Sequence, residues 1–309
     1  MLRNIRKIDG ERVYNTELKG EPLRLPLLSD SEMVEMMEKS IRGGISQVGQ
    51  LRYAEADNGH QLMYVDANNL YGWAMSQALP IGGFKWLDVN ALLTKLGAKR
   101  TKRRRKIELT NCRIIPDKES GLSRLELLDG TVVYDPNGNV GYKFEVDLVC
   151  PPEAQDRLRD LPGAPENVLV EREWLAELQQ TELDRRKHWT SDPMTKQKRS
   201  SVPKLCTTFF DKVNYVCEIE NLLCYLRLGY HLMKVHRVLQ YDQEKWLKPY
   251  IEFNTNLRAV AKTDFERDYY KLMNNSVFGK TMENVRKHKD IRFYHPDEMP
   301  KHDSPRLHT

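Results

Sequence analysis

Residues 249–280 read PYIEFNTNLRAVAKTDFERDYYKLMNNSVFGK, and this stretch predicts two helices joined by a tight turn. Pro249 suits the first turn of a helix, where the amide hydrogen that proline lacks has no partner in any case. The first helix should run through Ala261. Thr263 and Glu266 have the N-cap and third-residue spacing of a capping box, which predicts that a second helix starts there. We therefore expect a helical hairpin.

On the second predicted helix, a cation, an amide and an aromatic ring share one face. Lys271, Asn275 and Phe278 stand at positions i, i+4 and i+7. Arg258 and Lys262 add two cations near the tip of the hairpin. Taken alone, this helix fits two descriptions: an amphipathic helix whose lysine extends its ammonium to water, or a binding face.

A second stretch, QLMYVDANNLYG at 61–72, places one carboxylate at the end of an apolar run. The run predicts a strand over 61–66 that ends at Asp66. Two asparagines follow, and a turn or short helix over 70–77 should stop at Pro80. By itself the stretch fits a strand that ends in an Asx-rich turn.

The rest of the chain predicts an α+β protein with an antiparallel sheet. Residues 31–40 indicate a helix that leads to the sequence IRGG at 41–44, where paired glycines permit a tight turn. Further elements are predicted from apolar patterning. They are a strand over 142–149, a charged and irregular region over 153–205, a helix over 211–228 closed by Gly229, and strand-like stretches within 231–240.

Residues 89–139 differ in character from their surroundings and predict a small β-rich insertion. The basic run KRTKRRRK at 99–106 includes Arg103, Arg104 and Arg105. Such a run is most often a solvated loop, with phosphate binding and nuclear targeting as alternatives. Downstream, Asp129-Gly130 and Asn137-Gly138 both signal hairpin turns.

Composition limits the class of protein. The chain has 309 residues, a net charge of +5 and a pI of about 8.8, which favours an anionic partner. Its five cysteines are odd in number and form no CxxC pair, which favours a reducing compartment over disulfides or a zinc site. No signal peptide or membrane-spanning stretch is evident. We expect a soluble, intracellular protein with no membrane partner.

The two motifs together carry a resemblance to a known family. KLMNNSVFG at 271–279 resembles the K-x-x-x-N-S-x-Y-G motif of family B DNA polymerases, and DANNLYG at 66–72 resembles their D-x-x-S-L-Y-P motif. The motifs occur in the family's order, about 200 residues apart. The similarity extends over roughly 27–88 and 140–292 and is strongest to the protein-primed subgroup of organellar, viral and Polinton-like transposon polymerases.

The resemblance implies template-directed DNA synthesis, with two Mg²⁺ ions, deoxynucleotides, a DNA template and primer, and a terminal priming protein as partners. Its implied site residues have distinct roles. Asp66 and the backbone carbonyl of Ala67 would bind metal, and Tyr71 would exclude a ribose 2′-hydroxyl. Lys271, with Arg258 or Lys262, would bind the triphosphate, while Asn275 and Phe278 would support the new base pair. DNA would be contacted by Gly43 and Gly44, at the template backbone, and by Arg103, Arg104 and Arg105.

The resemblance also implies a division of the chain. It gives an N-terminal connector (1–60), a palm of antiparallel sheet (61–88 and 140–245), a basic insertion like the terminal-protein region (89–139), helical-hairpin fingers (246–292) and a disordered tail (293–309). The location would be the host nucleus if the chain comes from a eukaryotic mobile element.

Several positions depart from the family pattern. Ile41, Asn69, Gly72 and Phe278 stand where the family has Tyr, Ser, Pro and Tyr. The third motif, D-T-D, is absent, and no D-x-D occurs in the chain. Glu145 and Asp147 are the nearest alternative carboxylates, which the family pattern makes structural. We therefore expect a palm-and-fingers fragment that does not polymerise DNA alone, or a catalytically inactive remnant that binds nucleic acid. A basic adaptor without polymerase ancestry is the weakest alternative.

Overall fold

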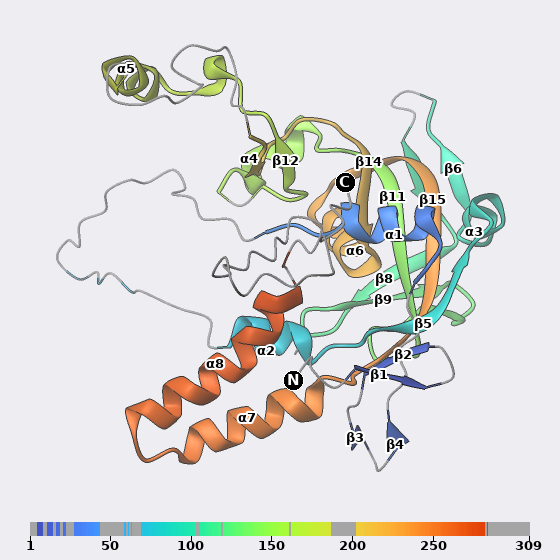
Figure 1. The fold of residues 1–309 in the computed structure, drawn as a ribbon. Helices are drawn as coiled ribbons and strands as arrows, with labels where there is room; N and C mark the ends of the chain where they lie inside the picture. The colour runs from blue at the N-terminus through green and yellow to red at the C-terminus, as the bar shows by residue number, and fades with distance from the viewer. Residues whose placement is uncertain are drawn as a thin grey trace, which may run out of the picture.

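The computed structural model describes residues 28–43, 59, 61, 63, 69–102, 106–118, 120–160, 162–186, 202–281 and 283, together with the backbone of four short strands between residues 5 and 22. Of the expected strand over 61–66, only residues 61 and 63 are described, and the expected disordered tail lies outside these residues. Within them the protein is α+β with antiparallel sheets, as predicted (Figure 1).

A six-stranded antiparallel sheet forms the centre of the molecule. Its strands run in the order β14 (Lys212–Glu218), β11 (Val140–Val149), β15 (His231–Glu244), β7 (Ile107–Leu109) and β6 (Ala98–Arg100), and β5 (Leu79–Trp86) also pairs with β15. The strands predicted over 142–149 and within 231–240 are therefore confirmed as β11 and β15. Strand β11 is paired along both edges and therefore lies inside the sheet, and most of its residues are buried.

One face of this sheet packs against α6 (Ile219–Leu228). Phe144, Val146 and Leu148 of β11 alternate onto that face and share a core cluster with Ile219 and Leu222. Gly229 ends the helix in the left-handed conformation, with φ of 101°. The predicted helix over 211–228 is correct only from residue 219, because its first part is strand β14, whose residues pair with β11.

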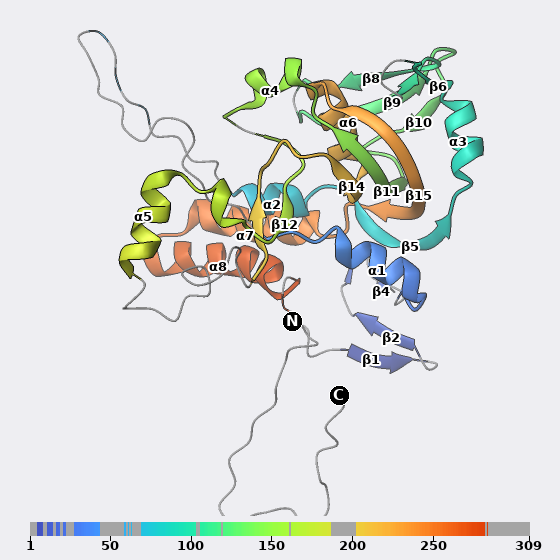
Figure 2. The same cartoon turned by 90° about the horizontal axis from the view of Figure 1, so that it is seen from above.

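The opposite face of the sheet packs against α1 (Ser31–Lys39), the helix predicted over 31–40 (Figure 2). Met36 is fully buried and contacts Val216 of β14 and Leu239 of β15. The sheet therefore lies between two helices, which is the usual way to bury both of its faces.

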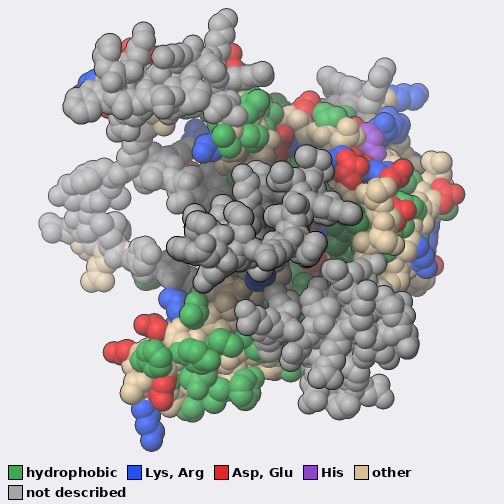
Figure 3. All heavy atoms as spheres, viewed as in Figure 1, with side chains coloured by type: hydrophobic (Ala, Val, Ile, Leu, Met, Phe, Trp, Pro, Cys, Tyr) green, Lys and Arg blue, Asp and Glu red, His purple; other side chains and the backbone are tan. Residues whose placement is uncertain are grey.

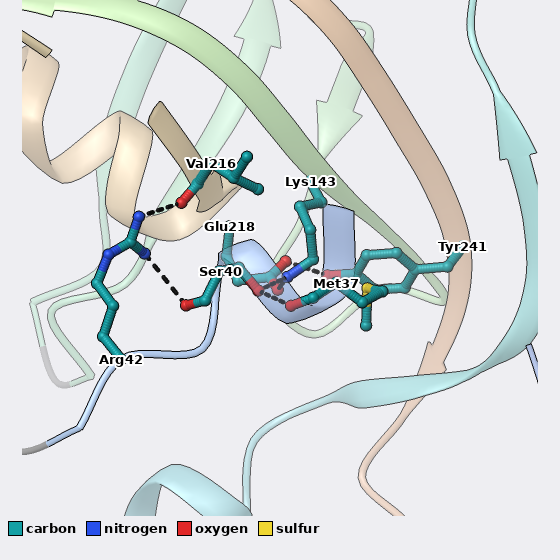
Figure 4. Close-up of polar contacts among 7 residues, drawn as sticks. All are labelled: Met37, Ser40, Arg42, Lys143, Val216, Glu218 and Tyr241. Carbon is teal, nitrogen blue, oxygen red and sulfur yellow. Dashed lines mark hydrogen bonds and ion pairs between the residues drawn. The ribbon is translucent and has the colours of Figure 1, made fainter. Parts of the chain in front are cut away.

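Two charged clusters hold the ends of α1 on the sheet. At the C-terminal end, the buried ammonium of Lys143 donates to Ser40 Oγ at 2.6 Å and pairs with the carboxylate of Glu218 (Figure 4). The hydroxyl of Tyr241 donates to the same carboxylate at 2.6 Å. At the N-terminal end, Arg237 pairs with Glu145 at 2.6 Å and with Glu32 of α1 at 3.7 Å.

The predicted insertion contributes to two sheets. After α3 (Val89–Lys95), β6 and β7 pair with each other, and β7 joins the central sheet through Ile107 opposite Leu232. A separate three-stranded sheet contains β8 (Cys112–Pro116), β9 (Ser123–Leu127) and β10 (Val132–Tyr134). The prediction of β-rich structure is confirmed here, while the domain boundaries remain predictions.

Only one of the two predicted hairpin turns joins paired strands. Asp129-Gly130 connects β9 to β10, which pair, and Gly130 has a φ of 88°. Asn137-Gly138 also forms a turn, but the hairpin prediction there is wrong. The strand that follows it, β11, has both edges occupied by β14 and β15, so β10 pairs with β9 instead.

Two regions have more regular structure than the sequence indicated. The region 153–205, predicted to be irregular, includes α4 (Pro152–Leu158), β12 (Glu166–Val168), a 3-10 turn (Arg172–Trp174), α5 (Glu177–Arg186) and the start of β13 (Lys204–Cys206), which pairs with β12. The expected N-terminal connector contains two paired strand couples, β1 (Ile5–Ile8) with β2 (Glu11–Tyr14) and β3 (Glu17–Leu18) with β4 (Glu21–Pro22).

The remaining helices are α2 (Leu70–Met75), α7 (Lys248–Val260) and α8 (Asp264–Thr281). None of the helices in the described part of the chain has the length and apolar character needed to cross a membrane. All five cysteines are described, and all are free.

The pairing of Lys143 with Glu218 generates a stability prediction. The substitution Glu218→Gln leaves the Lys143 ammonium, whose side chain is 2% exposed, without its carboxylate. We expect the free energy of unfolding to fall by about 3 kcal/mol in urea denaturation, because an uncompensated buried charge is costly. Glu244→Gln, at the exposed end of β15, is the matched control and should change it by less than about 0.5 kcal/mol. Equal stability of the two variants would contradict the prediction.

Candidate functional site

The helical hairpin predicted from residues 249–280 is present as α7 and α8. Pro249 lies in the first turn of α7, as expected. The capping box is also confirmed: Glu266 N–H donates to Thr263 Oγ1 at 3.2 Å, and Thr263 N–H donates to the Glu266 carboxylate at 3.2 Å. Hydrogen bonds from the backbone amides of Lys262 and Thr263 lower the pKa of Glu266.

The interior of the hairpin combines apolar and amide side chains. Ile251 and Asn254 of α7 and Asn274 of α8 are buried. The Tyr250 hydroxyl donates to the Met273 carbonyl at 3.1 Å and so links the two helices; burial raises the pKa of this tyrosine. The hairpin is thus held by polar as well as apolar contacts.

The short helix α2 lies against the hairpin and brings the two sequence motifs together (Figure 1). The ring of Tyr71 stacks on the ring of Phe278, with centroids 4.2 Å apart and planes inclined by 15°. Tyr71 remains 46% exposed, so one side of this stack is open to solvent. An aromatic pair of this kind prefers offset stacking and adds attraction beyond the area it buries.

The cations predicted to surround the site are all on the hairpin surface. Lys271 is exposed on α8, while Arg258 and Lys262 are exposed at the tip. Asn275 is half-buried. Phe278 is therefore the only one of these predicted residues for which a contact with the other motif is observed among the described residues.

The sequence reasoning missed Asn274, the one buried residue of α8. Its neighbours at helical spacing, Tyr270, Met273 and Val277, are half-buried, so the face toward α7 follows 270, 273, 274 and 277. That i, i+3, i+4, i+7 pattern was readable in the sequence.

Arg42 fixes the position at which the IRGG segment leaves α1. Its guanidinium donates to the Val216 carbonyl at 2.6 Å and to the Ser40 carbonyl at 3.1 Å (Figure 4), and it lies 4.1 Å from the centre of the Tyr215 ring. Gly43 is exposed, with no atom within 4 Å of the place where a β-carbon would be. The approach to Gly43 is thus unobstructed by the described residues.

Six predicted site residues lie outside the described residues: Gly44, Asp66, Ala67, Arg103, Arg104 and Arg105. The part of the chain that is described contains no group of three His, Cys, Asp or Glu side chains able to hold a metal ion. Of the two alternative carboxylates, Glu145 pairs with Arg237, and Asp147 accepts from the Asn214 amide at 2.9 Å and contacts His236 Nε2 at 2.7 Å. Both are engaged in structural contacts.

A cavity of about 570 Å³ lies between α2, α7 and the predicted insertion. It is lined mainly by polar side chains: Asn69, Ser76, Gln77, Asp117, Ser120, Asn137, Lys245, Lys248, Glu252, Thr255 and Asn256, with Gly72, Trp73, Leu122 and Ile251. Lys245 donates to Asn137 Oδ1 at 2.6 Å, and Lys248 pairs with Glu252 at 3.5 Å. Lys271 and Asn275 do not line it, so α7 rather than α8 faces this cavity.

Large apolar side chains gather on the outside of the hairpin (Figure 3). They are Phe253, Val260, Phe265, Tyr269 and Leu272, each between 48% and 79% exposed. Exposed aromatic and apolar residues interleaved with cations are typical of surfaces that bind a macromolecule.

Comparison of the chain with protein families, with curated proteins and with solved structures gives no significant match. The class that the fold defines is an α+β protein with an antiparallel sheet between two helices and a projecting helical hairpin.

The Tyr71–Phe278 stack generates a prediction about coupling between the motifs. In a double-mutant cycle of Tyr71→Ala and Phe278→Ala, unfolding in urea should give an interaction energy of about 0.5–1.5 kcal/mol, because the rings attract each other directly. Tyr71→Ala with Phe253→Ala is the control, since Phe253 is exposed on the same hairpin. Additive effects in the first pair would show that the stack contributes nothing to stability.

Proposed function

We propose that this chain forms the nucleotide-binding core of a family B DNA polymerase of the protein-primed type, with the sheet as palm and α7–α8 as fingers. The observation that carries the proposal is the contact of Tyr71 with Phe278. These residues belong to the two stretches that resemble the family's motifs, and they are separated by about 200 residues in the sequence.

The chemistry of the residues around this contact supports a nucleotide site. Lys271 is an exposed cation two turns before Phe278 on the same helix, suited to a triphosphate. Arg258 and Lys262 are further cations on the same hairpin. Tyr71 would lie under the sugar, where a ribose 2′-hydroxyl would collide with its ring; discrimination would come from exclusion rather than attraction.

In this proposal, DNA polymerisation uses two Mg²⁺ ions that activate the primer hydroxyl and stabilise the leaving pyrophosphate. Asp66 and the Ala67 carbonyl are the proposed ligands, and both lie outside the described residues. The described residues alone do not supply a metal-binding set. The proposed roles of this chain's described residues are therefore to bind and orient the nucleotide and the DNA.

The positive charge of the chain supports DNA as a proposed partner. The net charge of +5 and the basic run at 99–106 suit a polyanion. We propose that this run contacts DNA or a priming protein, a role that the salt dependence of DNA binding by a variant lacking Arg103, Arg104 and Arg105 tests directly.

A second candidate function is that of a catalytically inactive polymerase remnant that binds nucleic acid. The observation that favours it is the small number of carboxylates: the recognised motifs supply Asp66 alone, and Glu145 and Asp147 are engaged elsewhere. Two divalent cations need more anionic ligands than one aspartate offers.

The variant Lys271→Ala tests the nucleotide site. It should weaken deoxynucleotide binding to the protein–primer–template complex by about 10- to 100-fold, because a charge-assisted contact is lost, while DNA affinity stays within about twofold. Calorimetry measures the first quantity and fluorescence anisotropy the second. The control is Lys280→Ala, in the last turn of α8, which should affect neither. Equal losses of both affinities would assign Lys271 to the DNA backbone.

Primer extension distinguishes the two candidate functions. We expect the purified 309-residue chain to bind primer–template DNA with a strong salt dependence but not to extend it with Mg²⁺ or Mn²⁺, because one recognised carboxylate cannot fix both ions. Extension that is abolished by Asp66→Ala would overturn this expectation and assign a complete metal site to the chain. Absence of both extension and DNA binding would contradict both candidate functions.

A further inference from the structure

The hydroxyl of Thr255 lies where α2, α7 and α8 meet. It donates to the Ile251 carbonyl of its own helix at 2.7 Å. The same oxygen accepts from Asn274 Nδ2 of α8 at 3.3 Å and from Asn69 Nδ2, the residue before α2, at 3.5 Å. One side chain therefore joins the two helices of the hairpin to the residue before α2, which precedes them by more than 170 positions in the sequence.

Asn274 is an unusual residue for the position it occupies. It is 4% exposed, and its Oδ1 has no hydrogen-bond partner among the described residues. A buried carbonyl without a donor costs free energy, and an apolar side chain of similar size would avoid that cost. The contact of its Nδ2 with Thr255 gives the amide a role that an apolar residue could not fill.

Asn69 reaches Thr255 through a backbone conformation that few residues adopt. Its φ of 54° and ψ of 40° place it in the left-handed region, where asparagine is tolerated better than most residues. A β-carbon at Gly72 would lie 2.3 Å from both terminal atoms of the Asn69 side chain. The two departures from the family's D-x-x-S-L-Y-P motif are thus in contact: the glycine leaves the space that the asparagine uses.

Little apolar packing holds α2 in place. The helix has only six residues, of which Gly72 and Met75 are buried, while Leu70, Tyr71 and Trp73 are 44–57% exposed. A helix this short is not stable without tertiary contacts. The position of α2 therefore depends on the burial of Met75 and on the contacts of Asn69 and Tyr71 with the hairpin.

We propose that Thr255, Asn69 and Asn274 form a polar junction that sets the position of α2, and thereby the position of Tyr71 over Phe278, and so determines how strictly the site excludes a ribose. The three are positioning residues, since they act through Tyr71. The part of the proposal that concerns the sugar depends on the nucleotide-binding function proposed above; the part that concerns α2 does not.

The test uses two substitutions of one residue in the 309-residue chain. Thr255→Val keeps the shape of the side chain and removes the hydroxyl, while Thr255→Ser keeps the hydroxyl. Hydrogen exchange of the Trp73, Ser76 and Gln77 amides, which bond to carbonyls of residues 69–74, reports on α2. We expect about fivefold faster exchange in Thr255→Val, the effect of one lost hydrogen bond, and unchanged exchange in Thr255→Ser. Asn274→Leu should act like Thr255→Val.

A matched control separates the junction from a general effect of removing a helical hydroxyl. Thr94 in α3 donates to the carbonyl four residues earlier, as Thr255 does, but α3 lies apart from α2 and from the hairpin (Figures 1 and 2). Thr94→Val should leave α2 exchange unchanged. Unchanged α2 exchange in Thr255→Val, or acceleration in both Thr255→Val and Thr94→Val, would overturn the proposal.

The second readout is the ratio of dATP to ATP affinity in the presence of primer–template DNA. We expect it to fall at least about threefold in Thr255→Val and to recover in Thr255→Ser. Faster α2 exchange with an unchanged ratio would overturn the role in sugar exclusion. If the unmodified chain binds neither nucleotide, the proposed function fails, while the exchange result still decides whether the junction positions α2.

Discussion

The pairing of β5 with β15 is the constraint on which the arrangement of the candidate site depends. In this antiparallel pair, Leu79 at the start of β5 lies opposite Glu244 at the end of β15. The helix that precedes β5 and the hairpin that follows β15 must therefore lie at the same end of the sheet. This register brings residues 70–77 within reach of residues 248–281, although more than 170 positions separate them in the sequence.

On the face that packs against α1, the same sheet buries a charged side chain, which has a large desolvation cost. Lys143 lies at the centre of β11 with a side chain that is 2% exposed, and it remains compatible with folding because Glu218, Ser40 and Tyr241 complete its surroundings (Figure 4). An apolar residue at this position would avoid the desolvation penalty of a buried charge. The polar cluster contributes specificity of position. Ser40, which accepts from Lys143, is the C-terminal cap of α1, so the cluster fixes the place where the chain turns toward Gly43.

Local signals in the sequence predicted those parts of the fold that depend on interactions between residues close in the sequence. Pro249, Thr263 and Glu266 predicted the two helices of the hairpin, because capping depends on residues three or four positions apart. The helix prediction wrongly included strand β14, although its Val213, Tyr215 and Val216 are residue types enriched in strands. Pairing with β11, more than 60 residues earlier, decides its conformation, and such non-local pairing leaves little trace in a single segment.

In the candidate site, too, local patterns predicted some features, and others depend on contacts between distant segments. Periodicity correctly placed Lys271, Asn275 and Phe278 along one helix, but it did not identify Asn274 as the residue that is buried in the hairpin. A rotation of one residue on a helix is 100°, and only the partner helix determines which side is covered. That the segments of Tyr71 and Phe278 lie close together was expected only from the resemblance of two motifs to one family, because no property of either segment alone indicates the other.

The strengths of the contacts explain why α2 is the adjustable element of this arrangement. The central sheet is held by continuous backbone pairing and a core of fully buried side chains, which resist displacement. By contrast, α2 has Met75 as its one large buried side chain, and it contacts the hairpin through one aromatic stack, worth about 0.5–1.5 kcal/mol, and through hydrogen bonds worth about 1 kcal/mol each. The 3.5 Å contact of Asn69 with Thr255 is at the long end of the hydrogen-bonding range. Separating Tyr71 from Phe278 therefore costs only a few kcal/mol, while the sheet that positions both segments resists displacement.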